Sequence, residues 1–132
     1  MTPHAAAALT PSRPNRRLAY AILAALLLAA SVLEAVKHGT GYWQLAAFGI
    51  GPDVALVLGA GRGLVQGQLQ PRAVGLYNLL HRFWGPLALL ALAGTGLVPL
   101  GFAIGSLTWA FHIALDRTVG YGLRTRDGFQ RP

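Results

Sequence analysis

The chain has 132 residues, of which 54% are hydrophobic and only 11% are charged, whereas a soluble globular domain carries roughly 25% charged residues. We therefore do not expect a water-soluble fold, and the lack of cysteine excludes a disulfide-stapled secreted module. The net charge of +7 comes from basic residues beside apolar runs with no interleaved aromatic patch, which favours a lipid bilayer over nucleic acid as partner.

The first half of the chain predicts a tail and two membrane spans. Residues 1–17 have no apolar period and are expected to form a disordered basic tail, and the apolar run after them predicts a span over residues 18–37. A secretory signal peptide has the same pattern, but the later apolar segments favour a retained helix. The second span is placed at residues 42–59, where Tyr42 and Trp43 suit the membrane interface and Pro52 and Asp53 interrupt the helix.

The second half predicts a helical hairpin. A Gly-rich polar segment around residues 59–72 is expected to be a solvent-side loop. The stretch from Phe83 to Leu115 has no formal charge and contains glycine and proline near its middle, so a third span over residues 73–93 and a fourth over residues 100–119 are expected. Residues 18–122 would then form the transmembrane domain, and residues 123–132 a polar C-terminal tail.

Charge placement predicts the orientation of this all-α, four-helix bundle. Lys37 falls on one side of the bilayer and Arg82 inside the third span. The other basic residues fall on the opposite side, which predicts that both termini and the Gly-rich loop face the cytoplasm. These residues are Arg13, Arg16, Arg17, Arg62, Arg72, Arg117, Arg124, Arg126 and Arg131.

Several ionisable groups lie inside the predicted spans, where each costs about 2.5–3.5 kcal/mol. They are Glu34, Asp53, His81, Arg82, His112, Asp116 and Arg117, with Asn78 as an uncharged companion. At the helical rise per residue, Glu34 lies about 24 Å from the cytoplasmic end of its span and is a separate feature. Polar residues of the other three spans lie within about 5–12 Å of that end. Because His112 and Asp116 share a helix face, as do Asn78, His81 and Arg82, we expect one polar pocket in the cytoplasmic half.

Three sequence blocks carry most of these residues. They are Pro52-Asp53; Tyr77-Asn78 with His81 and Pro86; and Trp109-x-x-His112-x-x-x-Asp116-Arg117-x-x-Gly120-Tyr121-Gly122-Leu123. Together they resemble the domain of unknown function 4260 family of small bacterial membrane proteins, over residues 34–129. The resemblance implies a multi-pass protein of the bacterial cytoplasmic membrane and supplies no established activity.

The pocket admits three interpretations. Asp53, His81, His112 and Asp116 offer two nitrogen and two oxygen ligands that suit a divalent metal such as zinc. A metal-bound hydroxide there would suit a membrane hydrolase, and the pattern is loosely similar to that of inner-membrane metal-dependent hydrolases. Alternatively, the cluster is a structural network in which Arg82 pairs with Asp53 or Asp116. A further alternative is haem or quinone binding by His81 and His112.

A wider set of side chains is predicted to contact a small polar or lipid ligand. They are Asp53, Asn78, His81, Arg82, His112, Asp116, Arg117 and Tyr121. The substrate and the oligomeric state are left open by the sequence.

Overall fold

The structure is a computed structural model that describes residues 14–131. The predicted tail residues 1–13 lie outside this range. The helices are α1 (Pro14–His38), α2 (Tyr42–Ile50), the short 3₁₀ turn η1 (Gly51–Asp53), α3 (Val54–Leu58), α4 (Pro71–Leu80), α5 (Trp84–Gly94) and α6 (Leu100–Val119). Within the described residues, the β-type backbone pairing is limited to one isolated antiparallel bridge between Arg124 and Gln130. The fold is all-helical.

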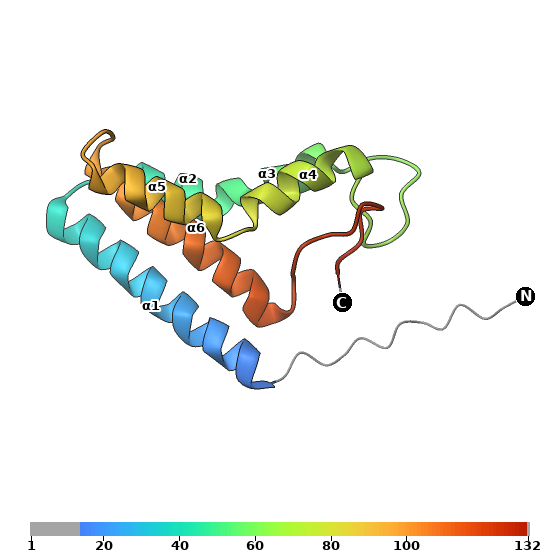
Figure 1. The fold of residues 1–132 in the computed structure, drawn as a ribbon, viewed down its shortest axis with the longest axis horizontal. Coiled ribbons are helices and arrows are strands. Elements are labelled where there is room, and N and C mark those ends of the chain that lie inside the picture. Colours follow the sequence, from blue (N-terminus) through green and yellow to red (C-terminus); the bar gives the residue numbers. More distant parts are fainter. Residues whose placement is uncertain (1–13, 132) are drawn as a thin grey trace, which may run out of the picture.

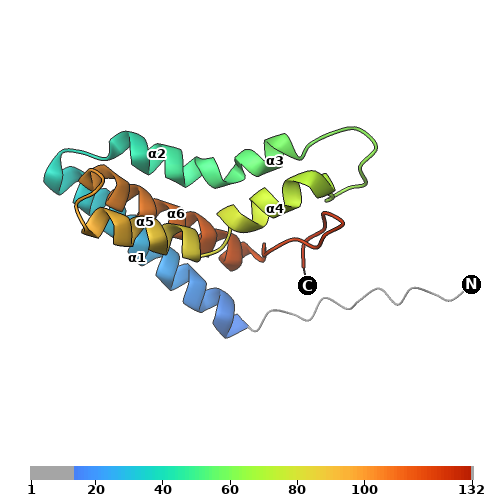
Figure 2. The ribbon, with the colours of Figure 1, turned by 45° about the horizontal axis from the view of Figure 1, so that its top comes forward.

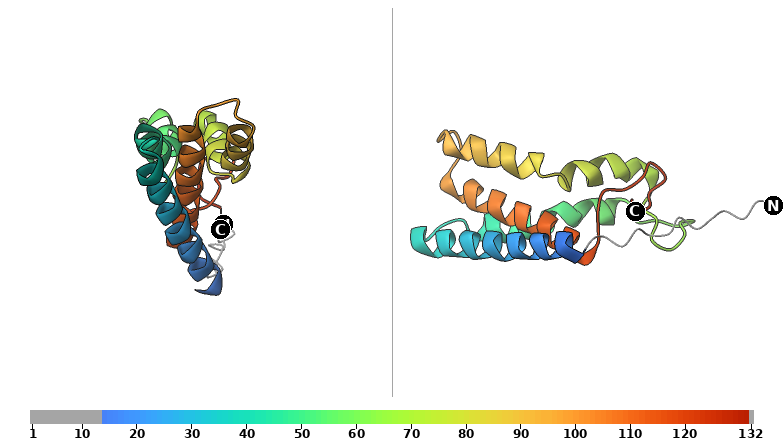
Figure 3. Two further views of the ribbon diagram at one scale, coloured as in Figure 1. Left: turned by 90° about the vertical axis from the view of Figure 1, so that its left-hand side faces the viewer. Right: turned by 60° about the horizontal axis from the view of Figure 1, so that its bottom comes forward.

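α6 is the central helix of the fold. α1, α2 and α5 each pack against it, while α4 packs against α3 (Figures 1 and 2). Figure 3 shows α6 between α1 on one side and α5 on the other. The buried residues of α6 are Gly101, Ile104, Gly105, Ser106, Thr108, His112, Ile113 and Ala114. His112, a residue of the polar cluster, belongs to this buried set.

Two glycines of α6 allow α2 to come close. A Cβ atom added to Gly101 would lie 2.4 Å from Nε2 of Gln44, and one added to Gly105 would lie 2.6 Å from Cδ2 of Phe48. Real carbon atoms do not approach so closely, so the small-x-x-x-small pair serves close helix packing. This approach brings the α2 end, and with it η1, alongside α6.

Two of the predicted spans are broken helices. The segment expected at residues 42–59 consists of α2, η1 and α3, and the break falls at Pro52, which has no N–H to donate. Residues 73–93 were expected to form one helix. This prediction is wrong, because the structure has two helices there, α4 and α5. Trp109 Nε1 donates to the carbonyl of Leu80 at 2.7 Å, and this bond satisfies a carbonyl at the end of α4 and supports the break.

α1 is the described helix that is long and apolar enough to cross a membrane, and only 17% of its most apolar window is buried. The segments Tyr42–Leu58 and Trp84–Gly94 are apolar but shorter. Helix length and composition therefore indicate one membrane-capable helix among residues 14–131, where four full spans were expected. α1 also begins at Pro14, so residues 14–17 belong to a helix and not to the predicted tail.

The C-terminal segment after α6 folds back onto α4. Gly120 ends α6 in a left-handed conformation with φ of 99°, which favours glycine. The side chain of Asn78 then holds the backbone of Arg124 twice, accepting from its N–H at 2.8 Å and donating to its carbonyl at 3.0 Å. The predicted tail is thus a packed part of the fold, and it covers the helix that carries His81.

Candidate metal centre

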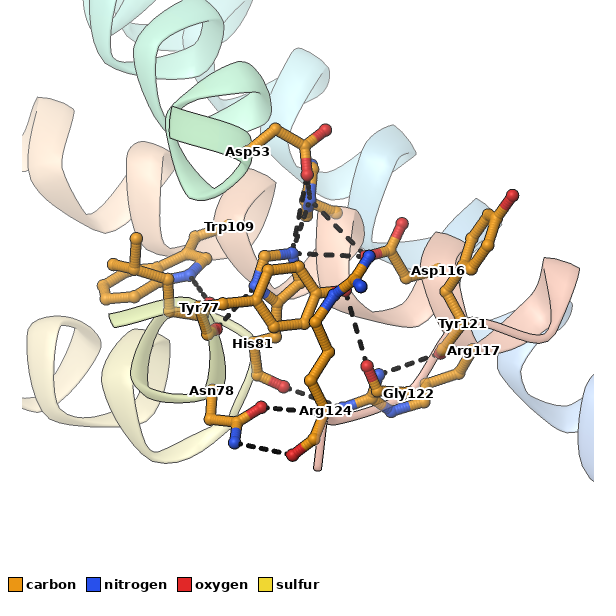
Figure 4. A network of polar contacts seen from close by, with 12 residues as sticks. Asp53, Tyr77, Asn78, His81, Trp109, Asp116, Arg117, Tyr121, Gly122 and Arg124 are labelled. Atoms are coloured by element: carbon orange, nitrogen blue, oxygen red, sulfur yellow. Dashed lines mark hydrogen bonds and ion pairs between the residues drawn. The ribbon is translucent and has the colours of Figure 1, made fainter. Parts of the chain in front are cut away.

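Four ligand-type side chains meet where η1, α4 and α6 converge. Asp53 ends η1 and His81 immediately follows α4, while His112 and Asp116 are one helical turn apart on α6. One ligand atom from each lies within 4.8 Å of all the others. Figure 4 shows Asp53 and Asp116 reaching the cluster from different helices, with His81 between them.

Backbone carbonyls fix the tautomers of both histidines. Nδ1 of His81 lies 2.8 Å from the carbonyl oxygen of Tyr77, and Nδ1 of His112 lies 2.9 Å from that of Gly49. A carbonyl oxygen only accepts, so each Nδ1 carries the proton and donates. In the neutral rings both Nε2 atoms therefore keep a free lone pair, directed at the centre of the cluster. This is the usual arrangement of metal-ligating histidines.

The distances from the two Nε2 atoms to the other ligand atoms are close to those within a tetrahedral coordination shell. Nε2 of His81 lies 3.5 Å from Asp53 Oδ1 and 3.3 Å from Asp116 Oδ2. The corresponding distances from Nε2 of His112 are 3.3 and 3.7 Å, and the two Nε2 atoms are 3.4 Å apart. Charge-assisted hydrogen bonds are shorter, about 2.7–2.9 Å. A tetrahedron with metal–ligand bonds of about 2.0–2.1 Å has edges of about 3.3–3.4 Å.

The histidine rings are held by aromatic stacking as well as by hydrogen bonds. The Tyr77 ring lies 3.9 Å from the His81 ring, centroid to centroid, at an interplanar angle of 14°. The guanidinium carbon of Arg124 lies 4.8 Å from the centre of the same Tyr77 ring. Because Tyr77 is buried and His81 is fully buried, this stack limits the motion of the His81 ring.

Burial differs sharply across the cluster. The side chains of His81, His112 and Asp116 are 0%, 8% and 19% exposed, whereas that of Asp53 is 46% exposed. Within residues 14–131, the ion-pair partners of both carboxylates are these two histidines, not Arg or Lys. Three ligands thus form a closed side, and Asp53 forms the open side.

A family model described as Domain of unknown function (DUF4260) matches residues 19–132. The chain belongs to this family. The match confirms the resemblance carried by the three sequence blocks, and it includes all four residues of the cluster. Among curated proteins and among solved structures, no relative matches the chain.

The remaining predicted site residues of this DUF4260 chain surround the cluster without entering it. Arg117 donates to the carbonyls of His81 and Tyr121 at 2.8 and 2.9 Å, so it ties α6 to the end of α4. Asn78 holds the backbone of Arg124, as described above. Arg82 is exposed, and within residues 14–131 Asp53 and Asp116 form their ion pairs with histidines, so the predicted pairing of Arg82 with Asp53 or Asp116 is wrong.

Sequence reasoning missed the groups that orient the ligands. The carbonyl of Gly49 has no side-chain signal, because any residue would supply the same oxygen. Arg124 was placed in a tail, and its contact with Tyr77 depends on the fold-back of that segment. The spacing of Tyr77 and His81 by four residues on one helix was the available signal for their stacking.

Proposed function

We propose that this DUF4260 protein is a membrane metalloprotein that binds one divalent transition metal through Asp53, His81, His112 and Asp116. The observation that carries the proposal is the meeting of four ligand atoms, with separations of 3.3–3.7 Å between each Nε2 atom and the other ligand atoms. With both imidazoles neutral and their Nδ1 atoms donating to carbonyls, all four atoms are acceptors. Two carboxylates and two imidazole lone pairs repel one another unless a cation lies between them. Two nitrogen and two oxygen ligands in this geometry suit zinc.

Multi-pass insertion is the second part of the proposal. Large apolar side chains are exposed along most of the helices, for example Leu26 at 64%, Val57 at 75%, Trp84 at 77% and Ile50 at 74%. Such a surface is costly in water and suits lipid. Short, broken helices are tolerated in a bilayer where their free backbone groups face protein, as the Leu80 carbonyl does at Trp109. The charge distribution then places both ends of the chain in the cytoplasm.

Metal-dependent hydrolysis is a second candidate function, favoured by the exposure of Asp53. Catalytic zinc keeps three protein ligands and leaves a position to water. Here His81, His112 and Asp116, the three less exposed ligands, would hold the metal, and the Asp53 carboxylate is 46% exposed to solvent. If a water molecule replaced Asp53 as the fourth ligand of the metal, the released Asp53 carboxylate would lie next to that water and could accept its proton as a general base.

The two other interpretations fit the distances less well. A haem iron between two imidazoles separates their nitrogens by about 4 Å, and the observed separation is 3.4 Å with carboxylate oxygens beside it. A structural network would need hydrogen bonds of ordinary length, about 2.7–2.9 Å for charge-assisted ones, whereas the His–Asp contacts measure 3.3–3.7 Å.

Metal analysis of the detergent-purified full chain tests the proposal. Wild type should carry about one zinc per chain, and His112→Ala and Asp116→Ala should reduce this at least tenfold, because each removes one of the proposed ligands from the less exposed side of the site. His38→Ala is the matched control. His38 is the last residue of α1 and pairs with Glu34 at 3.1 Å, so this substitution should leave the metal content unchanged. Equally negligible metal in wild type and variants, with lower thermal stability in the variants, would establish the structural network instead.

A further inference from the structure

A second concentration of charge lies at the end of the molecule where α1 begins and α6 ends. A cavity of about 320 Å³ there is lined by four arginines, Arg16, Arg17, Arg117 and Arg131. The chain has only four acidic residues, all within residues 14–131, and none of them lines this cavity. The side chains that line this cavity therefore include four guanidinium groups and no carboxylate.

The arginine cavity is organised by its surroundings. Arg117 donates to two carbonyl oxygens, those of Tyr121 and His81, so its guanidinium is held in place. Gly120, at a φ of 99°, leaves room for Arg17, because an added Cβ would lie 2.7 Å from Nη2 of that arginine. Preorganised guanidinium groups lose less entropy when they bind an anion.

A second hollow, whose wall combines the apolar residues Phe83, Trp84 and Leu87 with His81 and Arg82, adjoins the arginine cavity. Its volume is about 490 Å³, and it shares Tyr20, Arg117 and Leu123 with the arginine cavity. Phe83 and Trp84 extend its wall along the start of α5. The Tyr20 and Phe83 rings are nearly parallel, at an angle of 3° and a centroid distance of 6.4 Å. A ligand with one anionic end and one apolar end matches this pair of cavities.

We propose that these cavities bind an anionic amphiphile through its phosphate group. The phosphate lies among the arginines, whose forked donors match phosphate oxygens two at a time. The apolar part lies against Phe83 and Trp84. The location agrees with a membrane ligand, because the proposed topology puts this end of the bundle at the cytoplasmic headgroups. The inference rests on the arginines and does not depend on a bound metal.

Native mass spectrometry of the detergent-purified full chain tests this site with four probes: phosphatidic acid, phosphatidylcholine, glycerol 3-phosphate and oleate. We expect one phosphatidic acid per chain, bound at least about tenfold more tightly than phosphatidylcholine. The double variant Arg16→Gln/Arg131→Gln should weaken phosphatidic acid binding by about tenfold. The control Arg62→Gln/Arg72→Gln removes the same charge from exposed positions outside both cavities and should change it by less than about twofold.

Several outcomes separate the possibilities. Glycerol 3-phosphate binding as tightly as phosphatidic acid would support a phosphate site but overturn the membrane source of the ligand. An equal loss in the cavity variant and the control would overturn the site, because it would show attraction to overall charge only. Oleate binding as tightly as phosphatidic acid would overturn the choice of phosphate over carboxylate. Trp84→Ala should weaken phosphatidic acid binding while leaving glycerol 3-phosphate unchanged.

Discussion

At the scale of single residues, the cluster combines two rigidly held ligands, His81 and His112, with one solvent-accessible ligand, Asp53. The Nδ1 hydrogen bonds to Tyr77 and Gly49 set the direction of both histidine rings before any metal arrives. Asp116 is mostly buried on the same helix face as His112, whereas Asp53 is about half exposed at the end of a 3₁₀ turn. The site is therefore preorganised on three sides, and exchange of a ligand is expected on the fourth.

This difference predicts an exchangeable position at Asp53. In protein loaded with Co²⁺, added azide should alter the visible absorption spectrum, because the anion competes for the position on the exposed side. Asp53→Asn should strengthen this response, since a neutral amide is a weaker ligand than a carboxylate, and should retain bound Co²⁺. A spectrum that azide leaves unchanged in both proteins would indicate a closed structural site and contradict the hydrolase candidate.

At the scale of secondary structure elements, α6 decides the position of the ligands. It carries two of the four ligands, His112 and Asp116, and its glycines set the distance to α2. η1, which ends with Asp53, comes directly after α2 in the chain. The break between α4 and α5 places His81 at a helix end, where its side chain turns inward. Helix breaks at ligand positions are common in membrane proteins where the freed backbone faces protein.

The close approach of α2 and α6 yields a stability prediction. Gly105→Val should destabilise the fold by about 1–3 kcal/mol, because its side chain would overlap Phe48. The matched control is Gly75→Ala on α4, where an added Cβ meets nothing within 4 Å. This control should stabilise by about 0.5–1 kcal/mol through helix propensity. Denaturant unfolding in detergent, followed by circular dichroism, measures both changes, and an unaltered midpoint for Gly105→Val would contradict the packing described for α2.

At the scale of the whole molecule, the exposed apolar surface and the charge asymmetry predict how the chain crosses the bilayer. α1 suffices for one crossing by length. In the proposed four-crossing topology, the remaining crossings use α2 with α3, α4 with α5, and α6. Four crossings place the connection after α1 on one side and the connection before α4 on the other. One crossing alone would place both connections on the same side.

Cysteine labelling distinguishes these arrangements, because the chain has no cysteine of its own. A membrane-impermeant maleimide applied to intact cells should label Thr40→Cys and leave Gln66→Cys and Arg126→Cys unlabelled until the cells are lysed. All three positions are exposed in the structure. If all three variants were labelled in intact cells, the four-crossing proposal would be wrong, and α1 would be the sole crossing helix.

The sequence by itself determined the all-helical fold class and the approximate position of the polar residues along the predicted helical segments. Hydropathy and periodicity are local properties, so they located helices near residues 18–37 and 100–119 and showed polar groups of three segments at similar depth. The four proposed metal ligands could be named from that depth together with the preference of metals for imidazole and carboxylate. The family resemblance, carried by the blocks around Asp53, His81 and Trp109–Leu123, was confirmed.

Only the tertiary structure decided which of those residues face one another. The inward turn of His81, the outward position of Arg82 and the fold-back of Arg124 onto Tyr77 depend on a helix break and on contacts between segments far apart in the chain. The same is true of the carbonyl of Gly49, which reaches His112 only because α2 packs closely on α6. Depth along a helix follows from counting residues, but rotation about its axis is set by packing against its neighbours.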